Sequence, residues 1–200
     1  ILTQLKETLR FLRQPYFVIL TITAMMLGMI KEGLTLWTPS LISQSQGLDI
    51  GHAVQFSYLV PIMGILGVLL GGWLHHKVGD EAKTIMILYY TLAIACINAR
   101  FTMLFGSPVL FSLSLGLCSM LVHGINIVIM SIIPMSLSRS GKSSSIAGSL
   151  DSCSYLGAGM MAFATGIMLR TLSWSAILML WATISIVGGS ITLFNLRKPN

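Results

Sequence analysis

Six long apolar segments, separated by short polar breaks, occupy most of this 200-residue chain. They run approximately over residues 15–41, 53–74, 84–101, 108–137, 145–169 and 174–196. A helix needs about 20 predominantly apolar residues to cross the hydrocarbon core of a membrane. Only 9% of the residues are charged, against about 25% in an ordinary soluble domain, so little polar surface is available to face water. The pattern predicts an all-α membrane protein with six transmembrane helices in one bundle.

The basic residues are distributed unequally between the two sides of the predicted membrane. Only Arg100 and Arg170 fall on one side, and Lys31 lies inside a segment. The other side holds Lys6, Arg10, Arg13, Lys77, Lys83, Arg139, Lys142, Arg197 and Lys198. The positive-inside rule then predicts that both termini are cytoplasmic, which agrees with an even number of spans. The net charge of +6 is explained by this topology signal, and no basic helix suggests a nucleic-acid partner.

The first apolar segment contains two charged residues, Lys31 and Glu32. Lys31 lies near the middle of the membrane, where insertion of a lysine costs about 2.5–3.5 kcal/mol. A lysine at that depth is expected to face a cavity or an anion. Gly28 and Thr35 share its helix face, with Thr38 one turn further, and Gly28 is expected to leave room beside the ammonium group. Adjacent helix residues point about 100° apart, so we do not expect Glu32 to pair well with Lys31.

Two later segments also carry polar residues at membrane depth. His123 and Asn126 share one face of the fourth segment, where His123 could donate to an anion, relay a proton, or simply hydrogen-bond a neighbouring helix. Asp151 lies about two turns inside the fifth segment, where two interpretations stay open. It could form an ion pair, with Lys31 as one candidate, or it could line the cytoplasmic mouth of a pathway.

The first and fourth segments share a spacing that suggests an internal repeat. Pro39 follows Lys31 by eight positions, and Pro134 follows Asn126 by the same number. These segments occupy equivalent places in two sets of three, and sets of three spans insert with opposite topology. The pattern is that of an inverted three-plus-three repeat, which is common in secondary transporters.

Several short runs resemble the organophosphate:phosphate antiporters of the major facilitator superfamily, which include the glycerol-3-phosphate and hexose-6-phosphate transporters. The run Lys31-Glu32-Gly33 followed by Trp37-Thr38-Pro39 is similar to the seventh helix of those proteins. Gly72-Trp73-Leu74-His75-His76-Lys77-Val78-Gly79 resembles the superfamily's loop between its second and third, and its eighth and ninth, helices. The run Tyr155-Leu156-Gly157 resembles the eleventh helix of the same antiporters.

This resemblance implies a bundle that is the C-terminal half of a twelve-helix transporter in a plasma membrane, of the bacterial inner-membrane type. Residues 1–13 would be the end of the cytoplasmic linker, and residues 14–198 the six-helix bundle. By the same resemblance, Lys31 takes the place of the cation, usually arginine, that binds the substrate phosphate. His123 and Tyr155 take the places of tyrosines that line the site in the glycerol-3-phosphate type.

We therefore expect secondary transport of a small anionic solute, an organic phosphate, by alternating access. The expected partners are this solute, the lipid bilayer and a six-helix N-terminal half. Two alternatives remain open at this point: a transporter-like membrane sensor of a sugar phosphate, and a proton-coupled transporter of another solute that uses His123 or Asp151. No nucleophile–base pair or metal-ligand constellation suggests an enzyme, a metal site or a cofactor.

Overall fold

The computed structural model describes residues 14–136 and 143–195, and these residues form helices without any strand. The elements in chain order are α2 (Pro15–Gln46), α3 (Ile50–Ser57), α4 (Leu59–Val78), α5 (Glu81–Leu104), α6 (Pro108–Ile127), the π-helical turn η1 (Val128–Ile132), α7 (Ile133–Ser136), α8 (Ser143–Met168) and α9 (Trp174–Asn195). The all-α prediction is confirmed. The predicted linker end at 1–13 lies outside the described residues.

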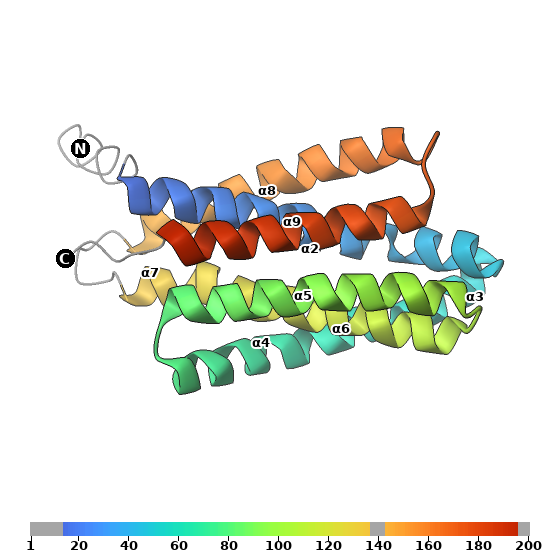
Figure 1. Cartoon of the computed structure of the whole chain (residues 1–200), viewed down its shortest axis with the longest axis horizontal. Coiled ribbons are helices and arrows are strands. Elements are labelled where there is room, and N and C mark those ends of the chain that lie inside the picture. The colour runs from blue at the N-terminus through green and yellow to red at the C-terminus, as the bar shows by residue number, and fades with distance from the viewer. Residues whose placement is uncertain (1–13, 137–142, 196–200) are drawn as a thin grey trace.

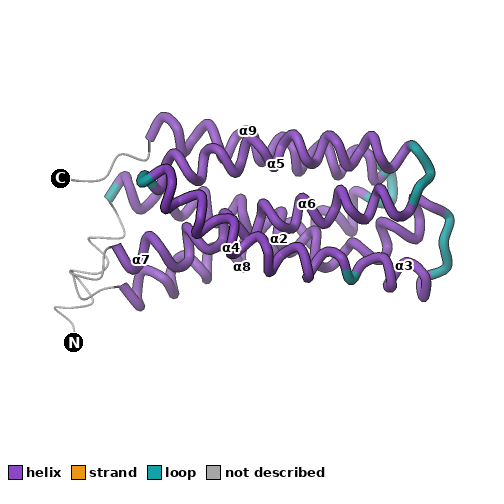
Figure 2. Tube along the Cα trace, turned by 90° about the horizontal axis from the view of Figure 1, so that it is seen from below, coloured by secondary structure: helices purple, strands orange, loops and turns teal. Residues whose placement is uncertain are grey.

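The long helices lie side by side along one common axis (Figure 1). The most extensive packing joins α4 to α6, α2 to α8 and α5 to α9. Seen from below, α5 and α9 form one outer layer, and α2, α4, α6 and α8 lie on the other side of it (Figure 2). The first residue of α2 and the last described residue of α9 are at the same end of the bundle, as an even number of crossings requires.

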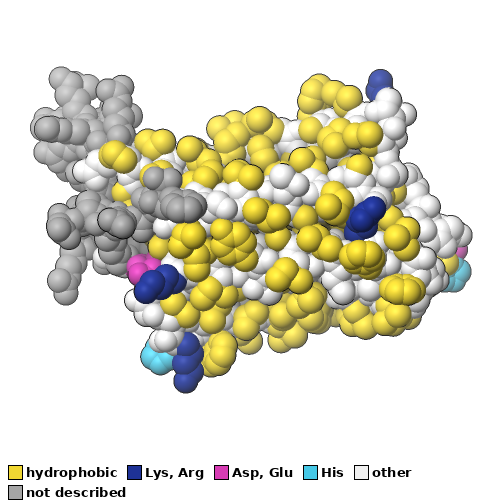
Figure 3. Space-filling view, viewed as in Figure 1, with side chains coloured by type: hydrophobic (Ala, Val, Ile, Leu, Met, Phe, Trp, Pro, Cys, Tyr) yellow, Lys and Arg dark blue, Asp and Glu magenta, His cyan; other side chains and the backbone are white. Residues whose placement is uncertain are grey.

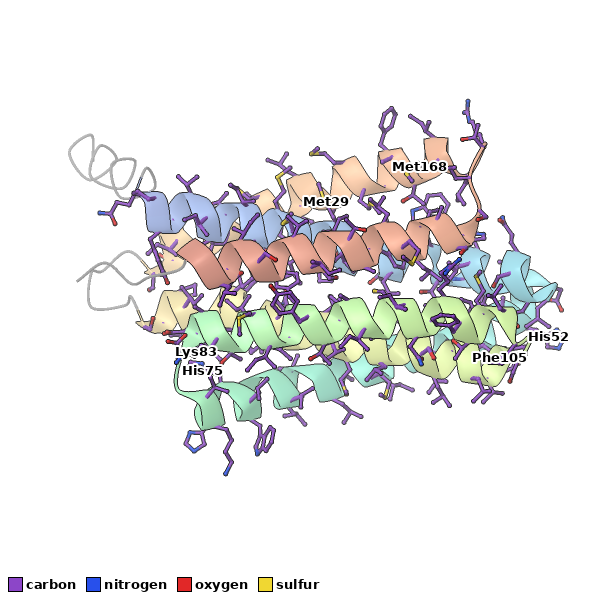
Figure 4. The ribbon with its side chains drawn as sticks, viewed as in Figure 1. Met29, His52, His75, Lys83, Phe105 and Met168 are labelled. Carbon is purple, nitrogen blue, oxygen red and sulfur yellow. The ribbon has the colours of Figure 1, made fainter. Side chains whose placement is uncertain are left out.

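On the face shown in Figure 3, apolar side chains cover most of the middle, and most of the charged and histidine side chains that are visible lie toward its two ends. His75 and Lys83 are close to one end, and His52 and Phe105 are close to the other (Figure 4). Large apolar side chains on the outer faces of the helices are strongly exposed, among them Ile94 and Phe163. Soluble monomers rarely expose apolar patches of this extent. The surface therefore fits a lipid environment.

Five segments are long and apolar enough to cross a membrane: Pro15–Gln46, Ile50–Val78, Glu81–Leu104, Pro108–Ser136 and Trp174–Leu193. They correspond to five of the six predicted spans. The sixth, α8, has 26 residues and runs alongside α2, but it is not among the five. Its first half is rich in serine and includes Asp151, which lowers its apolarity. The spanning role of α8 therefore stays a prediction.

The breaks between helices use the turn residues that the sequence provides. Gly47, Gly79 and Gly106 all have positive φ, a conformation that glycine adopts without steric cost. Gly47 and Gly79 directly follow the ends of α2 and α4, where such a residue satisfies a terminal carbonyl. Asp80 then caps α5 by accepting a hydrogen bond from the Lys83 backbone N–H at 2.9 Å.

Prolines modify two of the predicted spans. Pro61 has no N–H to donate to the Ser57 carbonyl, and the second span divides into α3 and α4 at Tyr58. Pro134 likewise has no N–H for the carbonyl four residues before it, and the π-helical turn η1 directly precedes the short helix that contains it. Pro39, in contrast, lies within the continuous helix α2.

The packing of the helices repeats within the bundle. A side-chain carbon at Gly157 of α8 would overlap the Met25 backbone carbonyl of α2, and one at Gly67 of α4 would overlap the Met120 carbonyl of α6. Met25 and Met120 are 95 residues apart, which is also the separation of Pro39 and Pro134. The α2–α8 and α4–α6 pairs therefore contain equivalent close crossings. This agrees with the three-plus-three repeat predicted from the proline spacing.

Candidate functional site

Lys31 lies at the centre of a small charged cluster on α2. Its Nζ atom is 3.4 Å from Glu32 Oε1 and 5.7 Å from the centre of the Tyr155 ring on α8. The Lys31 side chain is only 15% exposed. A cation within about 6 Å of an aromatic face is attracted by the negative potential of the ring. Lys31 and Tyr155, which are 124 positions apart in the sequence, are thus brought together.

The expectation that Glu32 would not pair with Lys31 is wrong. The two side chains leave α2 in different directions, but both are long and can bend toward each other in the space beside the helix. Within the described residues, Asp151 forms no ion pair with Lys31, and its side chain is exposed on α8. The resident counter-ion of Lys31 is therefore Glu32.

Gly28 also differs from its predicted role of leaving room beside the ammonium group. A side-chain carbon at Gly28 would overlap the backbone carbonyl of Ser154 on α8, so this space is already filled. Gly28 and Gly157 instead allow the backbones of α2 and α8 to approach closely, as small residues do in membrane helix pairs. This close crossing positions Tyr155, the residue after Ser154, beside Lys31.

His123 belongs to a second group of polar residues, between α2, α4 and α6. Its Nδ1 atom is 2.9 Å from the Ser119 carbonyl oxygen, one turn earlier on α6. Gly64 of α4 packs against the ring, since a side-chain carbon there would lie 3.0 Å from Nδ1. His123 lines a cavity of about 250 Å³, together with Thr35, Thr38, Pro39, Ser57, Val60, Pro61 and Ser119.

The two groups meet along α2. Thr35 lies one turn beyond Lys31, and its hydroxyl donates a hydrogen bond of 2.9 Å to the Lys31 backbone carbonyl. The cavity therefore begins one helical turn from the charged cluster, toward the α3 end of the bundle. A solute of modest length could contact both groups at once.

Two predicted site residues fall outside these groups. Asn126 is half-buried one turn beyond His123, and it does not line the cavity around His123. Asp151 is exposed one turn before Tyr155. The structure thus joins Lys31, Glu32 and Tyr155 in one cluster and His123 with Thr35 and Thr38 in another, whereas Asn126 and Asp151 belong to neither.

Sequence reasoning missed the part that α4 plays in the cavity. Ser57 and Pro61 come from the break between α3 and α4, and Ser119 anchors His123. One signal was available in the sequence. A hydroxyl residue precedes a proline by four positions at Thr35–Pro39 and again at Ser57–Pro61. Each pair marks a helical turn in which a backbone carbonyl lacks its usual donor.

Comparison with known protein families assigns most of the chain. The family described as Major Facilitator Superfamily matches residues 2–162. No curated protein matches the chain. The family match extends over the charged cluster, the cavity, the first four predicted spans and most of the fifth. The chain is therefore a multi-pass membrane protein of the major facilitator superfamily, whose members are secondary transporters.

Proposed function

We propose that this protein transports a small anionic solute, an organic phosphate, by alternating access, with Lys31 as the anion-binding group. The observation that carries the proposal is the position of Lys31 within the bundle, paired with Glu32 and facing Tyr155. A lysine is retained at such depth when an anion compensates for its cost. An ammonium group binds phosphate as a point charge, and the Tyr155 hydroxyl is a further potential donor.

We further propose that these helices form one half of a twelve-helix transporter and that a second bundle covers the site. Tyr155 and Thr35 are exposed beside the cluster, as are Asp151 and Ser152 on α8. Lipid cannot hydrogen-bond such groups, so a polar surface or a water-filled pathway opposite them is favourable. In this arrangement the two bundles rock about the site and open it to either side in turn.

The orientation of the bundle gives a prediction that is independent of the substrate. Lys77 and Thr171 are exposed near opposite ends of the bundle. In a cysteine-free background, we expect Thr171→Cys to react with a membrane-impermeant maleimide in intact cells, because it lies on the side with few basic residues. Lys77→Cys should react only after the cells are opened. The reverse pattern would contradict cytoplasmic termini.

The pairing of Lys31 with Glu32 predicts an unusual gain of affinity. A bound anion must compete with the Glu32 carboxylate for the ammonium group. Removing that carboxylate charge with Glu32→Gln is therefore expected to tighten phosphate binding. A partly exposed ion pair contributes roughly 0.5–1 kcal/mol, which corresponds to an affinity about two to five times higher.

The measurement is binding of radiolabelled inorganic phosphate and of glycerol 3-phosphate to the full-length protein in membranes. Asp151→Asn is the matched control, because it removes a carboxylate of α8 that does not pair with Lys31. Binding of both compounds that is tighter in Glu32→Gln and unchanged in Asp151→Asn supports the proposal. If the wild-type protein binds neither compound, the organic phosphate function is wrong.

A further inference from the structure

The hydroxyl groups that line the cavity beside His123 all donate their hydrogens to backbone carbonyls. Thr35 donates to the Lys31 carbonyl at 2.9 Å, and Thr38 donates to the Leu34 carbonyl. Ser57 donates to the Ala53 carbonyl at 2.8 Å, and Ser119 donates to the Val60 carbonyl at 2.7 Å. A hydroxyl group has one hydrogen and two acceptor lone pairs. Toward the cavity, these groups can therefore act only as acceptors. Thr35 and Ser57 have accessible surface, whereas Thr38 and Ser119 are buried behind them.

Two backbone carbonyls add to this acceptor character. Pro39 and Pro61 have no N–H, so the carbonyls of Thr35 and Ser57 lose the donor that a regular helix would supply. All four of these residues line the cavity. A carbonyl oxygen has two lone pairs, so these two groups retain acceptor capacity beside the hydroxyl groups.

The imidazole of His123 completes the set. A carbonyl oxygen can only accept, so the hydrogen of the 2.9 Å contact with Ser119 must be on Nδ1. In the neutral ring, Nε2 is then an acceptor. Within the described residues Nε2 makes no hydrogen bond. With the ring neutral, the lining of the cavity thus offers hydroxyl, carbonyl and imidazole acceptors, and no hydroxyl or imidazole donor on it is free.

We propose that this cavity binds the hydrogen-bond-donating part of the substrate, a hydroxyl or ammonium group, and rejects a second anionic group. The inference rests on the proposed function and makes it more specific, because the phosphate would bind at Lys31 and the donor-bearing tail would extend past Thr35 into the cavity. The volume of about 250 Å³ corresponds to roughly eight water molecules at about 30 Å³ each. This is too large for one bare metal ion, but it suits a short polyol or amino-alcohol chain.

Three phosphate esters of similar size test the inference by competition against radiolabelled phosphate on the full-length protein. Glycerol 3-phosphate carries two hydroxyl donors, n-propyl phosphate carries none, and 3-phosphoglycerate has a carboxylate at the far end. We expect n-propyl phosphate to bind about tenfold more weakly than glycerol 3-phosphate, because it leaves the acceptors without donors. We expect 3-phosphoglycerate to be roughly a hundredfold weaker, because its carboxylate would face only acceptors.

Substitutions of the residues that line the cavity should change the ratio of the affinities for glycerol 3-phosphate and n-propyl phosphate, and should not weaken the binding of all ligands equally. Thr35→Val removes one acceptor and is expected to lower the preference for glycerol 3-phosphate over n-propyl phosphate about threefold. Thr91→Val is the matched control, because Thr91 makes the same type of bond, to the Ile87 carbonyl, on an exposed face of α5. His123→Leu should reduce the preference, and His123→Gln, which retains an acceptor, should restore part of it.

The outcomes separate this inference from the proposed function. Equal affinities for the three esters would overturn the inference and leave the phosphate function intact. The same holds if Thr35→Val and Thr91→Val have equal effects on the ligand ratio. A requirement for Na⁺ that disappears in Thr35→Val would identify a cation site and would also overturn it. If none of the esters binds, the proposed function and this inference both fall.

Discussion

Uptake of organic phosphate by the full-length transporter is expected to fall by about thirtyfold or more when Lys31 is replaced by alanine. Removing one partner of a poorly solvated charge pair costs about 2–5 kcal/mol, and each 1.4 kcal/mol is a factor of ten. The ammonium group of Lys31 is the only cation in the described cluster with Glu32 and Tyr155. The measurement is initial uptake into vesicles, normalised to the amount of protein inserted in the membrane.

Two further variants distinguish loss of the anion site from loss of folding. Lys31→Ala leaves Glu32 without its partner, so the double variant Lys31→Ala/Glu32→Gln removes the unpaired charge and should recover stability but not uptake. Lys31→Arg retains the charge in a different shape and should retain partial activity. Wild-type affinity in Lys31→Ala would exclude this residue from substrate binding. Recovery of uptake in the double variant would show that the Lys31–Glu32 ion pair contributes only to stability and not to substrate binding.

The second large effect concerns stability and is expected at Gly157. Alanine at this position would place its methyl group on the Met25 backbone carbonyl, and neither backbone can move without separating α2 from α8. Overpacking of this kind costs about 1–3 kcal/mol. For a chain of this size, that corresponds to a decrease of roughly 2–4 °C in melting temperature for each kcal/mol. Thermal unfolding in detergent, followed by size-exclusion chromatography, measures the change.

Gly159 supplies the matched control on the same helix. A side-chain carbon at Gly159 would meet no atom within 4 Å. Gly159→Ala should therefore be neutral or slightly stabilising, because alanine favours the helix more than glycine does. Gly67 and Gly72 offer the same comparison on α4, where only Gly67 faces a backbone carbonyl. Equal melting temperatures for Gly157→Ala and Gly159→Ala would contradict the close crossing.

The helices and their boundaries were largely predictable from the sequence. Apolar length identifies a span almost independently of tertiary context, because lipid requires backbone groups to be paired within the helix. Gly47, Gly79 and Gly106 lie in the predicted breaks and have the left-handed conformation that a chain reversal requires. The first half of α8 is the exception, because its polarity keeps this helix from being recognised as a span by apolar length alone. Its serines satisfy their hydroxyls on the preceding turn, as Ser152 does on the Gly148 carbonyl, so it remains helical despite its polarity.

The candidate site was only partly predictable. A lysine at membrane depth is conspicuous in any sequence, and so Lys31 was readily found. Its pairing with Glu32 was missed because the prediction considered the direction in which each side chain leaves the helix and neglected its length. The role of Gly28 was missed because helix periodicity gives the faces of one helix but not the neighbour that fills them. The acceptor cavity depends on contacts among α2, α4 and α6, which no single segment contains.

The internal repeat has a consequence for how a solute can lie in the bundle. Gly67 and Gly157 occupy equivalent crossings, 90 residues apart, and the same separation relates Ile65 to Tyr155. Both of these side chains are exposed, at 68% and 59%, but one is aliphatic and the other aromatic with a hydroxyl. On the partner helices, Lys31 corresponds to Asn126. The backbone arrangement is thus nearly symmetric, whereas the side chains at equivalent positions are not, and only one of the two halves presents a cation. A solute with an anionic group therefore has one favourable orientation in the bundle. The reversed orientation would place the anionic group beside the amide of Asn126 and the aliphatic side chain of Ile65.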